Sequence, residues 1–466
     1  MTDPYGHNPP PTGHFQQPGQ RPGASANAAG APQFQAQPRF VDYGSPRSYD
    51  TSVRPASGFT RARHAPAQMQ LPSEAQPHSA WATQTRRVQE VAAEKSVVPA
   101  SRLAIWIVAS LLGIAFIVVL GLFFVGYAAG SSSSPVWWPV AAFLALFSLV
   151  VIFGVAWLAD RWDPQPIGLL LIAVFWGGAI AVGFSYIVNS LIGLVVYLMT
   201  SSEQASSFIG AVFGAPLVEE SSKGAGLLLL LFLARRYFNG PLDGAIYGML
   251  IGGGFAFTEN ILYYTRQFDS AGLGGLIFLV VLRGVFNIFG HAMYTGMTGI
   301  ILGFIARKWG TIPAALSFIF APWIGMFLHA MWNFGSSISG GLVGLIVMLV
   351  INAFITLLYF GLIGYLMWDE SRLTRVRLGD YANHGWLTHD EVQMLATWKG
   401  RREGKKWAAS IGAKPIMKRF IRESADLASV RQRLLADGRD PKALKQESAL
   451  LERLTANRQE LLQATR

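Results

Sequence analysis

The stretch FGAPLVEESSKGAGLLLLLF, from Phe213 to Phe232, places three ionisable side chains inside an apolar run that is long enough to cross a bilayer. Insertion scales assign a cost of about 2.5–3.5 kcal/mol to each such side chain at the middle of a membrane, so these groups usually face a protein-lined cavity and carry a function. On a helix, Lys223 lies four residues after Glu219 and three after Glu220, and it can therefore reach either carboxylate. The alternative interpretation is a structural ion pair between packed helices.

The composition of the whole chain is that of a polytopic membrane protein. Of its 466 residues, 52% are hydrophobic and only 14% are charged, and several apolar runs exceed the roughly 18 residues that mark a transmembrane helix. The formal net charge is +11, but no recognisable DNA- or RNA-binding motif gathers it, so the expected partner is the lipid bilayer and not a nucleic acid. The absence of cysteine excludes disulfides, cysteine-ligated zinc and thiol catalysis.

Eight apolar segments follow one another, and the basic residues between them predict their orientation. Lys and Arg occur before the first segment and after the second, fourth, sixth and eighth, whereas the other connections contain almost none. Because basic residues favour the cytoplasmic side, this alternation predicts an all-α bundle of about eight transmembrane helices in the cell membrane, with both termini cytoplasmic. The segments run over 103–128, 136–159, 166–199, 207–234, 242–265, 273–306, 312–338 and 341–368.

Composition divides the chain into three parts. Residues 1–100 are rich in Pro, Gln, Gly, Ala and Ser, which predicts a disordered cytoplasmic tail because such a segment cannot bury enough apolar area to offset its ordering entropy. Residues 101–368 form the transmembrane region, and residues 369–466 are predicted to form a short run of cytoplasmic helices. Within this last part, Thr388 and Glu391 have the spacing of a capping box at the start of a helix.

Four successive apolar segments carry polar side chains in their interiors. At about 1.5 Å of rise per residue, their carboxylates and imidazoles lie roughly 22–26 Å from the cytoplasmic boundary, so four antiparallel helices are expected to bring them to one level. A single membrane histidine is more often a hydrogen-bonding residue between helices, but two histidines level with several carboxylates indicate a site. These side chains are Glu219, Glu220 and Lys223, then Glu259, then His291, then His329 with Asn333.

Carboxylates, imidazoles and an amide in a dry cavity suit hydrolysis. A glutamate can take a proton from water as general base, imidazoles can bind a metal or donate to a developing oxyanion, and Asn333 can polarise a scissile carbonyl. Glu259, His291 and His329 offer one carboxylate and two imidazoles, a set that suits Zn²⁺ with an open fourth position. No dedicated zinc motif such as HExxH is present, so a metal-free mechanism, with histidine and Asn333 as oxyanion donors, is the alternative.

The polar motifs follow one another in a fixed order: DRWDPQP at Asp160–Pro166, EExxK at Glu219, Glu220 and Lys223, FxxxE at Phe255 and Glu259, Arg283 with His291, and HxxxN at His329 and Asn333. From about Leu158 to Trp368 the chain thereby resembles the PrsW family of intramembrane metalloproteases, which is related to the CAAX prenyl-protease and bacteriocin-processing group. The resemblance implies cleavage of membrane-embedded proteins, in some members single-pass anti-sigma factors. It also implies that Glu219 or Glu220 activates the water. Glu259, His291 and His329 would bind metal or stabilise the transition state.

A different class of function uses the same residue types. Buried carboxylates, histidine and lysine also build ion- or proton-coupled transporters. That class is expected to show inverted repeats with paired Gly or Pro interruptions, and the sequence contains no internal repeat. A third class, a scaffold that binds other membrane segments without catalysis, is disfavoured because every polar motif position is filled. Hydrolysis is the favoured interpretation.

The pattern of basic residues makes a prediction about topology. Reporter fusions at Ser132 and at the C-terminus are expected to lie in opposite compartments, because Ser132 follows the first segment and the C-terminus follows the eighth. Paired reporters, one active only outside the cytoplasm and one fluorescent only inside it, measure this directly. Both fusions in the same compartment would contradict the eight-segment topology.

Overall fold

The computed structural model of this chain describes residues 100–338, 341–437 and 441–465. These ranges contain helices and no strand, so the expected all-α class is confirmed. The chain separates into two units, Met1–Asp50 and Thr51–Arg466, and every described residue belongs to the second. The predicted disordered tail, residues 1–100, lies outside the described residues apart from its last position.

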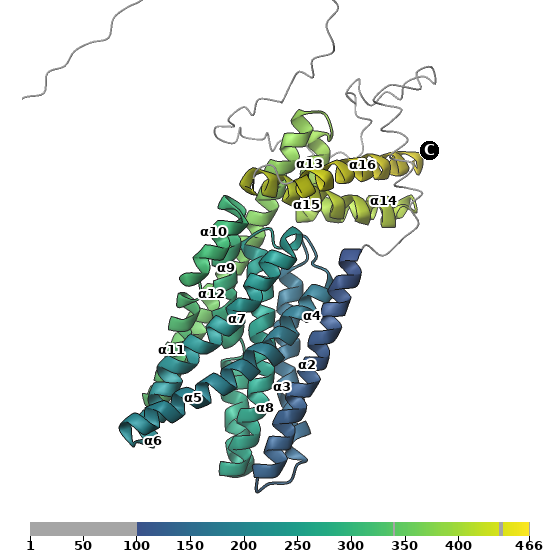
Figure 1. The fold of residues 1–466 in the computed structure, drawn as a ribbon. Coiled ribbons are helices and arrows are strands. Elements are labelled where there is room, and N and C mark those ends of the chain that lie inside the picture. The colour runs from purple at the N-terminus through teal and green to yellow at the C-terminus, as the bar shows by residue number, and fades with distance from the viewer. Residues whose placement is uncertain (1–99, 339–340, 438–440, 466) are drawn as a thin grey trace, which may run out of the picture. The chain divides into compact units, whose positions relative to one another are not determined.

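Six stretches of the described chain are long and apolar enough to cross a membrane, which confirms a multi-pass membrane protein. One group of buried apolar residues joins the helices of these stretches into a bundle (Figure 1). The stretches are Leu103–Gly130, Trp137–Ala159, Ile167–Thr200, Pro241–Trp309, Thr311–Ile338 and Gly341–Asn383. The helices of the bundle are α2 (Ala100–Gly130), α3 (Trp137–Ala159), α4 (Ile167–Phe175), α5 (Val182–Thr200), α6 (Glu203–Ile209), α7 (Ala215–Leu233), α8 (Pro241–Val281), α9 (Gly290–Trp309), α10 (Thr311–Leu316), α11 (Trp323–Ile338) and α12 (Gly341–Asn383).

Helix α7 corresponds to the predicted segment 207–234, yet it is not among the six apolar stretches. Its hydropathy is lowered by Glu219, Glu220 and Lys223, all of which are buried. A helix with three ionisable groups inserts poorly into lipid by itself. Helix α7 therefore depends on neighbouring helices that surround these side chains.

The predicted segments 242–265 and 273–306 fall within one apolar stretch, Pro241–Trp309. At Gly272 the backbone has a φ of 64°, which interrupts the helix between them and which glycine adopts without strain. A second interruption, the π-helical turn η5 (Leu282–Phe286), precedes α9. The number of membrane crossings therefore stays a prediction.

Helices α8 and α9 approach each other so closely that their backbones touch. A Cβ atom added to Gly244 would lie 1.9 Å from the carbonyl oxygen of Gly299, and one added to Gly299 would lie 1.9 Å from that of Gly244. A Cβ atom on Gly252 would lie 2.2 Å from the carbonyl oxygen of His291. Small residues permit such contact between membrane helices, and here they bring His291 directly against α8.

The opposite face of α8 is packed in the same way against the π-helical turn η2 (Trp176–Ala181) and the end of α4. A Cβ atom on Gly177 would lie 1.9 Å from the carbonyl oxygen of Ile251, and one on Gly254 would lie 2.0 Å from that of Val174. Helix α8 is thus enclosed on two sides by backbone contacts, which leaves little freedom for it to rotate or shift.

The described C-terminal part has four helices, which share an apolar core with the end of α12 at Leu378 and Tyr381. The predicted capping box is confirmed: the Thr388 hydroxyl accepts from the Glu391 backbone N–H at 3.1 Å, and the Glu391 carboxylate accepts from the Thr388 N–H at 2.8 Å. These helices are α13 (His389–Leu395), α14 (Trp398–Ser410), α15 (Lys414–Asp437) and α16 (Pro441–Gln463) (Figure 1).

The C-terminal helices bind the loop between α3 and α4, which carries the DRWDPQP motif. Arg401 donates to the backbone carbonyl of Trp162 at 2.6 Å, and its guanidinium lies 3.5 Å from the centre of the Trp162 ring. The Trp162 indole donates to Thr374 of α12 at 2.9 Å. Burial lowers the pKa of Arg401 to about 10, so the guanidinium stays charged at neutral pH.

The C-terminal helices also contact the segment between α7 and α8. Arg235 of that segment forms an ion pair of 2.9 Å with Asp437 at the end of α15.

The backbone contact between α8 and α9 predicts that a Gly→Ala substitution destabilises the protein at this contact but not at an open position of another helix. Gly244→Ala is expected to lower the free energy of unfolding by about 1–3 kcal/mol or more, because the added methyl group overpacks a closed contact. Gly364→Ala on α12 is the control, since a Cβ atom there meets nothing within 4 Å, and its effect should stay within about 0.5 kcal/mol. The fraction of protein that remains folded after heating in detergent measures both. Equal loss in the two variants would contradict the close packing.

Candidate active site

Three ionisable side chains of α7 lie together in the interior of the bundle. Glu219, Glu220 and Lys223 are 5%, 0% and 0% exposed. The Lys223 ammonium lies 2.7 Å from Glu220 Oε1 and 3.3 Å from Glu219 Oε2, so it contacts both carboxylates, as the helical spacing predicts. It also lies 3.8 Å from the centre of the Phe255 ring of α8. One lysine is therefore shared by two acidic groups.

Two histidines from other helices complete this cluster. His291 of α9 has Nδ1 2.9 Å from Lys223 Nζ and Nε2 2.9 Å from a carboxylate oxygen of Glu259 on α8. His329 of α11 has Nδ1 3.1 Å from Glu220 Oε1, and the centres of the two imidazole rings are 4.9 Å apart. The groups that the sequence places at one depth are thus in contact, and four helices supply them.

Glu259 is held by an arginine as well as by His291. Arg283, in the π-helical turn η5, forms an ion pair with Glu259 and donates from Nε to the Asn260 side chain at 2.8 Å. Its guanidinium also lies 4.2 Å from the centre of the Tyr263 ring. Glu259 is therefore fixed between a cation and an imidazole.

The carboxylates of the cluster outnumber its cations. The carboxylates of Glu219, Glu220 and Glu259 are accompanied by the cations of Lys223 and Arg283. With all three carboxylates ionised and both imidazoles neutral, the cluster would carry one net negative charge. Uncompensated charge is costly in a buried site, so the cluster can take up either a proton or a further cation.

One group of three side chains has the geometry to hold a metal ion. Glu219, His291 and His329 are buried, and one ligand atom of each lies within 4.8 Å of the other two. One carboxylate and two imidazoles suit zinc with an open position. The Lys223 ammonium lies against Glu219 Oε2 and His291 Nδ1, so a metal ion at these atoms would take the place of the ammonium. The three donors fit zinc, although the carboxylate of this group is Glu219, whereas the sequence suggested Glu259.

Both histidines also have the support that metal-binding histidines usually have. In such sites the second ring nitrogen donates to a carboxylate or a carbonyl, which orients the ring. His291 has Nε2 against Glu259, and His329 has Nδ1 against Glu220. Each ring is thus oriented by a carboxylate outside the group of three.

Asn333 lies one turn after His329, but its amide is directed elsewhere. Its Nδ2 donates to the backbone carbonyl of Ala211 at 2.8 Å. Ala211 belongs to the π-helical turn η3 (Gly210–Gly214), which leads into α7. The amide therefore ties α11 to the turn that precedes Glu219.

Some polar contacts of the cluster were not expected from the sequence. The Thr295 hydroxyl, which is fully buried, donates to Glu220 Oε2 at 2.9 Å, and Asn189 of α5 donates to Glu219 Oε1 at 3.4 Å. Thr295 follows His291 by four residues, so the helical spacing that relates Glu219 to Lys223 could have found it. Asn189 lies in a segment without any ionisable neighbour, and no local pattern indicates it.

A polar cavity of about 320 Å³ reaches the carboxylates of Glu219 and Glu259. Tyr186 and Tyr263 belong to its wall and are 49% and 40% exposed. Asn189, which contacts Glu219, also lines it. The cavity thus connects the cluster to the exterior of the bundle between α5, α7 and α8.

The fold and the site define a multi-pass α-helical membrane protein with carboxylates and imidazoles gathered in its interior. Residues 165–359 match the profile of the PrsW family of intramembrane metalloproteases. The chain is also 28% identical over 200 residues to Protease PrsW of Clostridioides difficile (strain 630), an alignment that covers 41% of this chain and 79% of that protein. No solved structure matches the chain. Both matches bear out the resemblance to the PrsW family seen in the sequence, and they support a protease.

Proposed function

We propose that this protein hydrolyses peptide bonds of single-pass membrane proteins at the cluster of Glu219, Glu220, His291 and His329. The observation that carries the proposal is the convergence of two carboxylates and two imidazoles from three helices in the interior of a membrane bundle. The match to a family of intramembrane proteases favours hydrolysis over the ion-coupled transport that the same residue types permit.

Glu219, His291 and His329 are the residues that would hold a zinc ion. A bound zinc ion supplies Lewis-acid activation of water and of the scissile carbonyl. Glu220 is then the other carboxylate of the α7 pair, and it takes the proton of the attacking water as general base. Thr295 and Lys223 hold this carboxylate in place through bonds of 2.9 and 2.7 Å.

A metal-free mechanism has support from one observation, the position of Lys223. Its ammonium lies against Glu219, Glu220 and His291, where it can stabilise a developing oxyanion. In that mechanism Glu219 is the general base, because it is the member of the pair that lines the polar cavity. The two mechanisms differ in the role of Glu219, which is a metal ligand in one and the base in the other.

Two further residues act on the site by positioning other groups. Arg283 holds Glu259, which in turn orients the ring of His291. Asn333 holds the turn η3 that leads into α7, so we assign it a positioning role and not the polarisation of the scissile carbonyl.

We further propose that the protein lies in the cell membrane with both termini in the cytoplasm. Lys and Arg favour the cytoplasmic side, and the C-terminal helices contact the basic ends of the predicted segments. Asp437 pairs with Arg235 at 2.9 Å, and Gln432 donates to the backbone carbonyl of Arg307 at 2.9 Å. These contacts support one common side for the basic ends and the C-terminal helices.

Removing either carboxylate of the pair should abolish most of the activity. Glu219→Gln and Glu220→Gln are each expected to lower the rate of cleavage of a single-span peptide in proteoliposomes by more than about tenfold, roughly 1.4 kcal/mol in the barrier. Glu203→Gln is the matched control, because Glu203 is exposed in the first turn of α6. Heat stability in detergent should show that all three variants are folded. Activity within about tenfold of the wild type would remove that carboxylate from the mechanism.

The metal content of purified variants separates the two mechanisms. Zinc is expected at saturation in the wild type and should be lost, together with activity, in Glu219→Gln, His291→Ala and His329→Ala. Glu259→Gln removes only a group that orients His291, so its zinc affinity should fall by about 10–100-fold without loss of stoichiometric binding at saturation.

Elemental analysis and zinc titration of the purified variants provide the measurement. If Glu259→Gln no longer binds zinc while Glu219→Gln still does, then Glu259 and not Glu219 is the metal ligand. Full activity in protein shown to hold no transition metal would leave the metal-free mechanism standing.

A further inference from the structure

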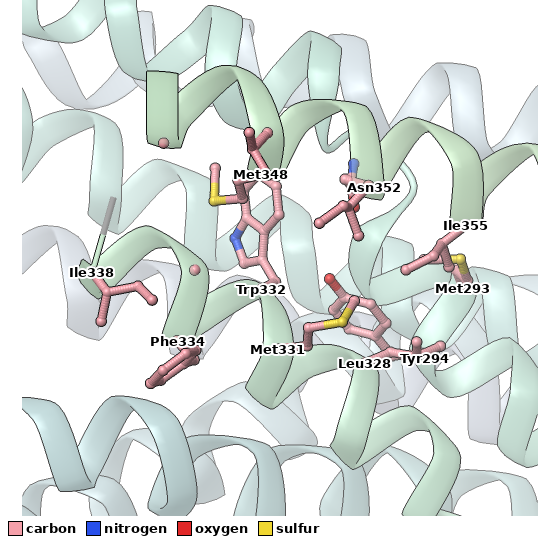
Figure 2. A pocket seen from close by; sticks show the side chains of 14 residues that line it. Met293, Tyr294, Leu328, Met331, Trp332, Phe334, Ile338, Met348, Asn352 and Ile355 are labelled. Atoms are coloured by element: carbon pink, nitrogen blue, oxygen red, sulfur yellow. The ribbon is translucent and has the colours of Figure 1, made fainter. Parts of the chain in front are cut away.

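A second cavity of about 370 Å³ lies among α9, α11 and α12, and it does not touch the carboxylates. Its walls are mainly apolar, and they include Leu328 and Trp332 of α11 and Met348 and Ile355 of α12 (Figure 2). Two other lining residues, Val347 and Ile351 of α12, are 52% and 45% exposed. These exposed positions place the cavity beside the outer, lipid-facing surface of α12.

One side chain connects this cavity to the histidines of the site. Tyr294 of α9 lines the cavity, and its ring stacks on that of His329 with 5.2 Å between centres and 17° between planes. The Tyr294 ring centre is also 5.8 Å from that of His291. The stacked Tyr294 ring therefore separates the cavity from the imidazole of His329, and the same ring makes an edge contact with His291.

The hydroxyl group of Tyr294 indicates what kind of group the cavity receives. Tyr294 is 1% exposed, and its hydroxyl lies near the Asn287 side chain without making a well-formed hydrogen bond to any described residue. Figure 2 shows this hydroxyl directed towards the other lining side chains. An unsatisfied buried polar group costs about 1–3 kcal/mol, so an occupant that brings a hydrogen-bond acceptor is favoured over a purely apolar one such as a lipid acyl chain.

A peptide at the point of cleavage has both required features. Its helix must be unwound locally for hydrolysis, which leaves backbone carbonyl groups without their helical partners, and such groups need new donors in a membrane. Its side chains in a membrane segment are mostly large and apolar, which matches the walls of the cavity. An unwound transmembrane segment can thus accept a hydrogen bond from the Tyr294 hydroxyl and, with the same segment, fill the apolar space of the cavity.

We propose that this cavity is the subsite for a large apolar side chain, Leu, Met or Phe, next to the scissile bond of a transmembrane substrate. Tyr294 donates to a backbone carbonyl of the same segment. The inference rests on the proposed function and specifies its substrate: a membrane segment with a large apolar residue at one position beside the cleaved bond.

A peptide series with two matched variants tests the subsite. Single-span peptides in proteoliposomes carry Ala, Leu or Phe in turn at each position near the cleaved bond, which mass spectrometry locates. At one position the wild type should cleave the Leu or Phe peptide at least about tenfold faster than the Ala peptide, the discrimination that apolar pockets achieve. Ile355→Trp fills the cavity and should remove or reverse this preference. Phe354→Trp should retain it, because Phe354 is 61% exposed and lies outside the cavity.

A binding measurement separates failure of the subsite from failure of the proposed function. A single-span peptide with benzoylphenylalanine at the scanned position should crosslink to the lining residues of α11 and α12 in the Glu220→Gln variant, and Ile355→Trp in addition should prevent this. If the wild type cleaves no peptide but the crosslink forms as expected, the cavity binds an apolar side chain of a membrane segment, and only the proposed hydrolysis falls.

Two outcomes would overturn the subsite. The first is a peptide preference in Ile355→Trp that equals that of the wild type. The second is labelling of the same lining residues by a phospholipid with a photoreactive acyl chain that excess peptide does not displace, which would assign the cavity to lipid.

Discussion

Helices α8 and α9 are in direct backbone contact at their glycines, and this contact fixes how the two helices are rotated relative to each other. Gly244, Gly252 and Gly299 let the two helices touch, and Gly177 and Gly254 fix α8 against η2 and α4 on its other side. Because α8 cannot rotate between these contacts, Glu259 is held where His291 reaches it. Helix α7 then places its carboxylates and lysine against the same imidazoles. The site is therefore positioned by main-chain packing and not by flexible side chains.

The arrangement of charge follows from that packing. Three carboxylates share the two cations Lys223 and Arg283, so the carboxylates outnumber the cations by one. Ionisable groups are costly in the interior of a membrane protein and usually mark a functional site, and an additional carboxylate beside two imidazoles suits a proton or a cation. The aromatic rings of Phe255 and Tyr263 lie against the two fixed cations and add cation–π stabilisation. The contacts that stabilise the buried charges are therefore made by the same residues that carry the proposed chemistry.

The two cavities give the site two different surroundings. The cavity that contains Glu219 and Glu259 is polar and suits water, whereas the cavity behind Tyr294 is apolar and suits a membrane segment. A hydrolase within a bilayer needs both environments, because its substrate is apolar and its second reactant is water. The C-terminal helices lie apart from this chemistry, bound to the loop at Trp162 through Arg401.

The all-α membrane class, the resemblance to the PrsW family, the contacts of Lys223 with both carboxylates and the capping box at Thr388 could all be predicted from the sequence. These depend on local properties, namely hydropathy, helical spacing and motif order. The packing of the helices was needed to see that Glu219 forms a possible metal site with both histidines, that Arg283 pairs with Glu259 and that Asn333 binds the η3 backbone. The depth of a residue can be counted along a helix, but its direction depends on how neighbouring helices are rotated. Glycine contacts between segments far apart in the chain set that rotation.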